Sequence, residues 1–76
     1  MQIDKQQVGK RIHQLRTTAG LSMAALASAV GLAGKSTIND WEKGRTLAST
    51  ERMTKLAVFF KVSTNYLLYG NLTEYV

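Results

Sequence analysis

Side chains suited to covalent or acid–base chemistry are scarce in this sequence. It has no cysteine, a single histidine (His13), and only five Asp and Glu residues, which are scattered. No second metal ligand lies near His13 in the sequence, and the carboxylates show none of the paired arrangement that acid–base catalysis uses. We therefore expect no catalytic residue, no metal and no cofactor, and we assign His13 to the surface. The chemistry that remains is hydrogen bonding and charge.

The stretch from Ser22 to Gly44, SMAALASAVGLAGKSTINDWEKG, has the spacing of two short helices that cross closely. Ala27 has little side chain, so a second helix can approach its backbone, and Gly31 can take the left-handed conformation that ends a helix. Larger apolar residues then face inward at helical spacing: Leu26, Val30, Ile38 and Trp41. The outer face of the second helix stays free. A helix-turn-helix of this kind places its second helix in the DNA major groove, so DNA binding is the leading hypothesis.

Length and charge are consistent with this hypothesis. Seventy-six residues predict one domain, residues 1–76, and a hydrophobic content of 45% predicts a compact fold. The net charge of +5 favours polyanionic partners, because each phosphate that is neutralised releases a counterion. No apolar run reaches the roughly 18 residues of a membrane span, and no signal peptide opens the chain. We expect a cytoplasmic protein without a membrane partner or an evident small-molecule substrate.

The elements that position this unit are all helical, since no alternating strand pattern is present. Helix starts recur at five N-cap candidates, each flanked by an apolar staple: Asp4, Ser22, Gly34, Ser49 and Ser63. Glycines mark four helix ends: Gly20, Gly31, Gly44 and Gly70. The pattern predicts helices over about residues 5–18, 23–30, 35–43, 50–60 and 64–69. The last two helices add Leu56, Phe60 and Leu67 to the expected core.

The order of these parts resembles the lambdoid phage repressor and Cro family, also called Xre-like regulators. The resemblance covers roughly residues 8–72 and rests on the sequences VGKRIHQLR, GLSMAALASAVG, STINDWEKG and MTKLAVFFKVSTNYLLYGN. It implies a compact five-helix, lambda-repressor-like domain whose second and third helices form the helix-turn-helix at about residues 22–44. It also implies sequence-specific binding of double-stranded DNA by a transcriptional regulator, most often a repressor of phage or prophage type.

Two features depart from the family pattern. Met23 occupies the position where the family usually has a glutamine that anchors a phosphate, and a thioether is only a weak hydrogen-bond acceptor. The turn from Leu32 to Thr37 has six residues where family members commonly have five. The first departure weakens one phosphate contact. The second shifts the expected start of the recognition helix.

The resemblance assigns DNA contacts around the third helix. Base edges would be contacted by the outward-facing residues Lys35, Ser36, Asn39 and Asp40. Lysine donates to guanine, asparagine pairs with adenine, and aspartate accepts from cytosine. Phosphates would be contacted by Met23, Thr37, Lys43, Arg45 and Arg11. The alternative for the four base-contacting residues is an ordinary solvated helix face.

Other residues have structural interpretations. By the resemblance, Arg16 and Glu42 form a partly buried ion pair between the first helix and the end of the third, and so Arg16 is not a DNA contact. Trp41 belongs to the core rather than to a stacking surface. The remaining basic residues outside the recognition unit are assigned to surface solubility: Arg52, Lys55 and Lys61.

One recognition helix reads only a few base pairs, so the family's solution is a homodimer on a palindromic operator, with recognition helices about 34 Å apart. Apolar C-terminal residues are candidates for the dimer contact, or else cover the core: Tyr66, Tyr69, Leu72, Tyr75 and Val76. The sequence leaves open whether the chain is complete or is the DNA-binding part of a longer repressor. Repressor and activator are not separated by sequence. An antitoxin-like protein-interaction module is the second functional class, and an enzyme is the third.

Overall fold

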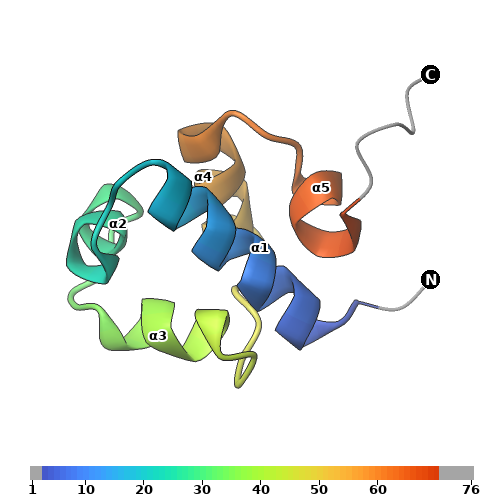
Figure 1. Ribbon diagram of the computed structural model, residues 1–76, viewed down its shortest axis with the longest axis horizontal. Helices are drawn as coiled ribbons and strands as arrows, with labels where there is room; N and C mark the ends of the chain where they lie inside the picture. Colours follow the sequence, from blue (N-terminus) through green and yellow to red (C-terminus); the bar gives the residue numbers. More distant parts are fainter. Residues whose placement is uncertain (1–2, 71–76) are drawn as a thin grey trace.

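The computed structural model describes residues 3–70, and in that range it contains five α-helices and no strand. The helices are α1 (Lys5–Thr18), α2 (Met23–Ala29), α3 (Ser36–Glu42), α4 (Thr50–Phe60) and α5 (Thr64–Tyr69). In Figure 1, α1 crosses the middle of the molecule, α2 and α3 follow one another around its lower left, and α5 lies at the other end. The predicted all-α, five-helix fold is confirmed. None of the described helices is long and apolar enough to cross a bilayer.

Four of the five predicted N-caps are confirmed by a hydrogen bond from the first turn. Asp4 accepts from the Gln6 amide at 2.9 Å, and Ser22, Ser49 and Ser63 each accept from the amide three residues later at 2.9–3.2 Å. Each bond satisfies an amide that has no partner within the helix.

The exception is α3, where the prediction of Gly34 was wrong. The N-cap is Lys35, whose side chain makes no capping bond, and the helix begins at Ser36. Glycine has no side-chain acceptor, so nothing at Gly34 fixes the start of the helix. Two helix ends also fall one residue short of the predicted ones, because α2 ends at Ala29 and α3 at Glu42.

The core lies where the five helices meet and consists of buried apolar side chains from all of them. It contains seven of the eight predicted core residues: Leu26, Ala27, Val30, Ile38, Trp41, Leu56 and Leu67. Phe60 is the correction, since it is only half-buried and packs against the edge of the core. As the last residue of α4, it lies where the helix leaves the core, and its ring contacts the exposed Phe59 edge to face, with 5.0 Å between centroids.

Two glycines allow α1 to approach the end of α3. A Cβ at Gly9 would lie 2.3 Å from the Trp41 carbonyl oxygen, closer than any side chain tolerates. Gly44 has φ +74°, and a Cβ there would lie 2.7 Å from Cγ of Gln6. Any side chain at these positions would push the recognition helix away from α1. Gly44 was predicted from the sequence as a helix end, whereas the role of Gly9 was not predicted.

Two arginines bind the carbonyl ends of other helices, which the sequence did not indicate. Arg52 donates from Nη1 to the Val30 carbonyl at 3.0 Å, so its assignment to surface solubility was wrong. Arg11 donates from Nε to the Leu67 carbonyl and from Nη2 to the Leu68 carbonyl, both at 2.9 Å. Carbonyls in the last turn of a helix lack helical partners, and these bonds tie α4 to α2 and α1 to α5. Lys55 and Lys61 are exposed as expected.

Candidate nucleic-acid interface

The helix-turn-helix consists of α2, a turn and α3, and the small residues of the sequence fix its geometry. Gly31 has φ +78°, and the next amide, of Leu32, donates to the Ala27 carbonyl at 2.8 Å. The left-handed residue reverses the chain direction after α2. Ala27 of α2 and Ile38 of α3 are both buried in the core, and the two helices are in contact. These contacts turn one face of α3 inward and leave the opposite face for solvent.

The outward face of α3 has the polar residues expected there. Lys35 and Ser36 are exposed, and Asn39 and Asp40 are half-buried. Within residues 3–70, no intramolecular hydrogen bond engages the side chains of Lys35, Ser36 or Asn39. Donors and acceptors that are not engaged by the protein are what a hydrogen-bonding surface for base edges requires. The structure therefore groups these residues on one accessible face.

Asp40 differs from its neighbours because it has a charged partner. Its carboxylate lies 3.2 Å from Nη1 of Arg45, and the two side chains are 41% and 62% exposed. The pair joins a residue predicted to contact bases to one predicted to contact phosphates. The negative charge, which DNA phosphates would repel, is thereby partly neutralised by the guanidinium.

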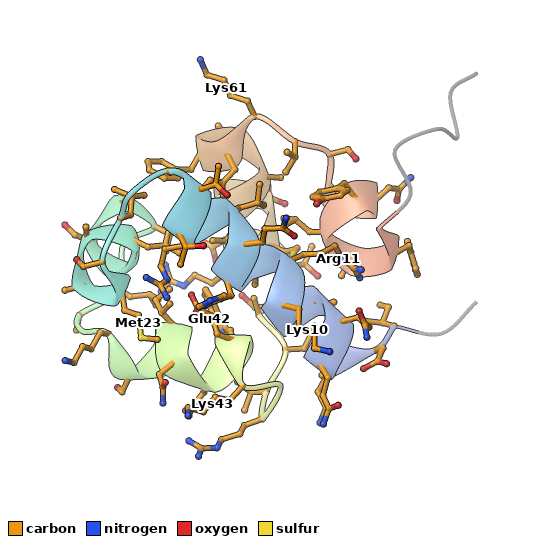
Figure 2. The ribbon with its side chains drawn as sticks, in the orientation of Figure 1. Lys10, Arg11, Met23, Glu42, Lys43 and Lys61 are labelled. Atoms are coloured by element: carbon orange, nitrogen blue, oxygen red, sulfur yellow. The ribbon has the colours of Figure 1, made fainter. Side chains whose placement is uncertain are left out.

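The residues predicted to contact phosphates fall into two groups. Met23, at the start of α2, lies beside α3, and Lys43 follows the last residue of that helix (Figure 2). Thr37 is half-buried in the first turn of α3. Arg11, by contrast, lies beside α5, where its Nε and Nη2 are occupied by carbonyls (Figure 2). The structure thus places Arg11 away from the other predicted contacts.

The Arg16–Glu42 pair is formed, and it links α1 to the end of α3. Arg16 donates from Nε to Oε2 at 2.5 Å and from Nη2 to Oε1 at 3.0 Å, and its Nη1 donates to the Leu21 carbonyl at 2.8 Å. Both side chains are nearly buried, with 10% and 4% exposed. The doubly bonded pair is the geometry in which an arginine binds a carboxylate most strongly.

The ion pair shifts the pKa values of both groups further in favour of their charged forms. The hydrogen bond to Glu42 raises the pKa of Arg16, against the opposing effect of burial. Burial alone would raise the pKa of Glu42, but the hydrogen bonds from Arg16 and His13, together with their charges, outweigh burial and lower it. Glu42 is therefore ionised at neutral pH.

His13 adds a third group that the sequence analysis did not connect with this pair. Its Nδ1 lies 2.8 Å from Oε1 of Glu42, while the side chain is 56% exposed. The prediction of a surface residue is correct for exposure, but the contact was missed. The available signal was the spacing of His13 and Arg16, which are three residues apart and thus neighbours on one face of α1.

A hollow of about 240 Å³ opens where α1, the start of α2 and α3 meet. We call it the junction hollow, and it is lined by His13, Met23, Asn39, Glu42 and Lys43. Figure 2 shows Glu42 between α1 and α3, with Met23 to its left and Lys43 below it. The hollow borders α3 directly. Within residues 3–70, His, Asp and Glu side chains do not gather in the groups of three or more that could hold a metal ion.

Comparison with known proteins agrees with this geometry. The family model HTH_3, described as helix-turn-helix, matches residues 12–67. This range includes the whole of α2, α3 and α4, the second half of α1 and most of α5. Sequence comparison with curated proteins gives no match.

Several solved structures share the fold over nearly their whole length. The P22 c2 repressor, in complex with a synthetic operator, is 30% identical, with 93% of this chain and 100% of that chain covered and a TM-score of 0.80. The restriction-modification controller protein C.AhdI from Aeromonas hydrophila is 32% identical, with 86% and 97% covered and a TM-score of 0.77. The N-terminal DNA-binding domain of SinR from Bacillus subtilis is 27% identical, with 91% and 97% covered and a TM-score of 0.74. The chain therefore belongs to the helix-turn-helix family of repressor- and Cro-type, Xre-like regulators.

Proposed function

We propose that this protein is a transcriptional regulator that binds double-stranded DNA in a sequence-specific manner, with α3 in the major groove. The observation that carries the proposal is the outward face of α3, where the side chains of Lys35, Ser36 and Asn39 make no hydrogen bond within residues 3–70, while Ile38 and Trp41 on the opposite face are buried. The operator complex of the similar P22 c2 repressor supports it. The net charge of +5 adds a favourable, sequence-independent attraction to DNA.

Base reading is proposed for the residues of the outward face. Lys35 donates to guanine O6 or N7, Asn39 pairs with adenine and Asp40 accepts from cytosine N4. Ser36, in the first turn, can donate to or accept from a base edge. Because Asp40 is paired with Arg45, base reading by Asp40 requires this ion pair to open or to remain at the edge of the groove.

Phosphate contacts are proposed for residues that flank this face: Met23, through its backbone, and Thr37, Lys43 and Arg45. Such contacts orient the protein on the duplex and carry no sequence information themselves. We do not include Arg11, since its Nε and Nη2 bind the Leu67 and Leu68 carbonyls at 2.9 Å. Its role is to hold α5 against α1.

Two substitutions separate base reading from phosphate binding. Lys35→Ala is expected to weaken binding to the preferred operator by about 1–3 kcal/mol and to relax one base position. Arg45→Ala is expected to weaken all duplexes about equally and to reduce the salt slope by about one unit. Lys61→Gln is the matched control, because Lys61 projects from the end of α4 far from α3 (Figure 2). If the first two variants behave alike in titrations across salt, the division of roles is refuted.

A homodimer on a palindromic operator is also proposed. An apolar hollow of about 220 Å³ opens at the start of α4, and its lining contains no ionisable side chain: Ile3, Leu47, Ala48, Thr50, Met53, Thr54, Thr64 and Leu68. Two chains of charge +5 repel each other, so two copies can associate with the least electrostatic repulsion through an uncharged surface. Ile3 and Leu47 are exposed at this hollow, which allows one copy's Leu47 to enter the hollow of the other in a two-fold arrangement.

The predicted C-terminal dimer residues can be compared with this surface only in part. Tyr66 is half-buried and Tyr69 is exposed, whereas Leu72, Tyr75 and Val76 lie outside the described residues. Leu47→Glu is expected to shift the chain towards monomer in sedimentation experiments and to weaken operator binding while helicity is retained. If the variant sediments as the parent does, the hollow is not the dimer contact. A parent chain that is monomeric even on operator DNA contradicts the homodimer itself.

The rest of the proposal follows from this role. The protein acts in the cytoplasm as one domain over residues 1–76, as a repressor of phage or prophage type, without a cofactor and without enzymatic activity. The similarity to the P22 c2 repressor supports the repressor type. A promoter fusion with the operator placed over the promoter tests it, with reporter output expected to fall when the protein is expressed.

A further inference from the structure

The junction hollow contains the only histidine of the chain. His13 is exposed, but its Nδ1 is held by the nearly buried carboxylate of Glu42 at 2.8 Å. Among residues 3–70, no partner is seen for the other ring nitrogen, Nε2. The ring is therefore fixed by one nitrogen and available through the other, beside the helix proposed to enter the groove.

The carboxylate determines what Nε2 can do. Glu42 is ionised at neutral pH, as shown above, and an ionised carboxylate only accepts hydrogen bonds. Nδ1 must therefore carry a hydrogen, so that Nε2 of the neutral ring has none and is an acceptor. A phosphate oxygen is also an acceptor and cannot bind it. Uptake of one proton converts Nε2 to an N–H donor and the ring to a cation, and both changes favour a phosphate.

Three charged side chains surround the ring. On α1 itself, Nη2 of Arg16 lies 3.3 Å from Nδ1, and on α3 the carboxylate of Glu42 accepts from both groups. Arg16 and Glu42 are opposite charges bound to each other. Lys43, directly after α3, adds a positive charge to the lining of the hollow, and α2 contributes the uncharged Met23. A phosphate placed here would add the negative charge that favours the protonated ring.

We propose that His13 is a further phosphate-contacting residue, and that DNA binding takes up a proton on this imidazole. The junction hollow borders α3. When α3 lies in the major groove, the sugar–phosphate backbone of one DNA strand therefore passes this hollow. The inference rests on the proposed function for this reason. It makes operator affinity higher when the imidazole is protonated than when it is neutral.

The test is a binding titration by fluorescence anisotropy at about pH 8 and about pH 5.5. The probes are a duplex selected from a random pool with the parent chain and a duplex of random sequence. The parent is expected to bind both roughly three- to tenfold more tightly at the lower pH, with a salt slope steeper by about 0.9, the value for one added phosphate contact. At both pH values, His13→Gln is expected to bind with the weaker affinity that the parent chain shows at the higher pH.

Two further variants sharpen the comparison. His13→Lys carries a permanent charge and is expected to bind with little dependence on pH. Lys61→Gln, far from α3 (Figure 2), is the matched control and should retain the pH dependence of the parent. Circular dichroism at both pH values verifies that each variant is folded.

The outcomes separate this inference from the proposed function. If the parent binds the selected duplex equally at both pH values, or if His13→Gln retains the pH dependence, the role of His13 is refuted while α3 can still read the groove. If neither duplex is bound at either pH by the folded chain, the proposed function itself is overturned, and the inference with it.

Discussion

Removal of the Glu42 carboxylate is expected to be among the most destabilising polar substitutions in this chain. The group is 4% exposed and accepts from Nε of Arg16 at 2.5 Å, from Nη2 of Arg16 at 3.0 Å and from Nδ1 of His13 at 2.8 Å. In Glu42→Gln the amide has the same shape but no charge, so the guanidinium of Arg16 is left buried without its counter-charge. Breaking such a pair from one side costs about 3–5 kcal/mol.

In this variant Arg16 keeps its hydrogen bond to the Leu21 carbonyl, at 2.8 Å, and the amide oxygen of the new Gln can still accept from the guanidinium. We therefore expect a loss of stability at the low end of this range, about 3 kcal/mol. A chain of 76 residues has a total stability of about 4–11 kcal/mol. The melting temperature should therefore fall by about 12–24 °C.

Urea unfolding followed by tryptophan fluorescence measures this loss. Trp41 is the only tryptophan, is 4% exposed, and directly precedes Glu42, so its emission reports the packing of α3. The midpoint should fall with an unchanged m-value. Glu51→Gln is the matched control, because Glu51 is 77% exposed and lies 3.9 Å from Lys55, an exposed pair that contributes little.

The reasoning is refuted if Glu42→Gln and Glu51→Gln have the same midpoint. A double variant tests whether the loss comes from the unpaired buried charge or from any change at this position. Replacing both partners, with Arg16→Met and Glu42→Leu together, leaves no buried charge and is expected to recover most of the lost stability.

Three further outcomes are expected. The pKa of Glu42 is lower in the folded protein than in the unfolded chain. The stabilisation that the ionised carboxylate provides is therefore complete at neutral pH and is lost as the pH falls through the pKa of the folded state. On acidification, the urea midpoint should fall less in Glu42→Gln than in the parent. Gly9→Ala should lose about 1–3 kcal/mol or more in thermal melts, since its Cβ would meet a backbone carbonyl at 2.3 Å, whereas Gly34→Ala, where a Cβ meets nothing, should melt close to the parent. Arg11→Met should lose about 1–3 kcal/mol by leaving two carbonyls unsatisfied, with no change in the salt slope of DNA binding.

Local patterns were sufficient to predict most of the fold. Asp4, Ser22, Ser49 and Ser63 act through hydrogen bonds to amides two or three residues away, so their role can be read from neighbouring residues. The start of α3 was misplaced because its cap has no side-chain bond at all. Where a helix is fixed by packing rather than by its own cap, the sequence alone gives only an approximate boundary.

The contacts that escaped prediction join residues far apart in the chain. Arg11 binds carbonyls 56 and 57 residues away, and Arg52 binds one 22 residues away. A basic residue on a helix surface looks the same in sequence whether it faces water or the end of another helix. The Arg16–Glu42 pair, 26 residues apart, was predicted only because the family resemblance supplied the long-range information. The neighbouring His13 had no such guide.

The candidate interface was predictable in its location and less so in its details. The periodicity that buries Ile38 and Trp41 also determines which side of α3 is exposed. It does not indicate that Asp40 pairs with Arg45 at 3.2 Å, or that Asn39 lines the junction hollow. These details depend on side-chain conformations after the chain has turned at Gly44.

The most direct test of the proposed role of α3 is the mapping of backbone amide shifts by NMR as a selected operator duplex is added. The largest changes are expected from Lys35 to Lys43 and at the start of α2, with small changes in the exposed part of α4 around Val58. Operator binding with the α3 amides unchanged and the shifts concentrated on α4 would contradict the account.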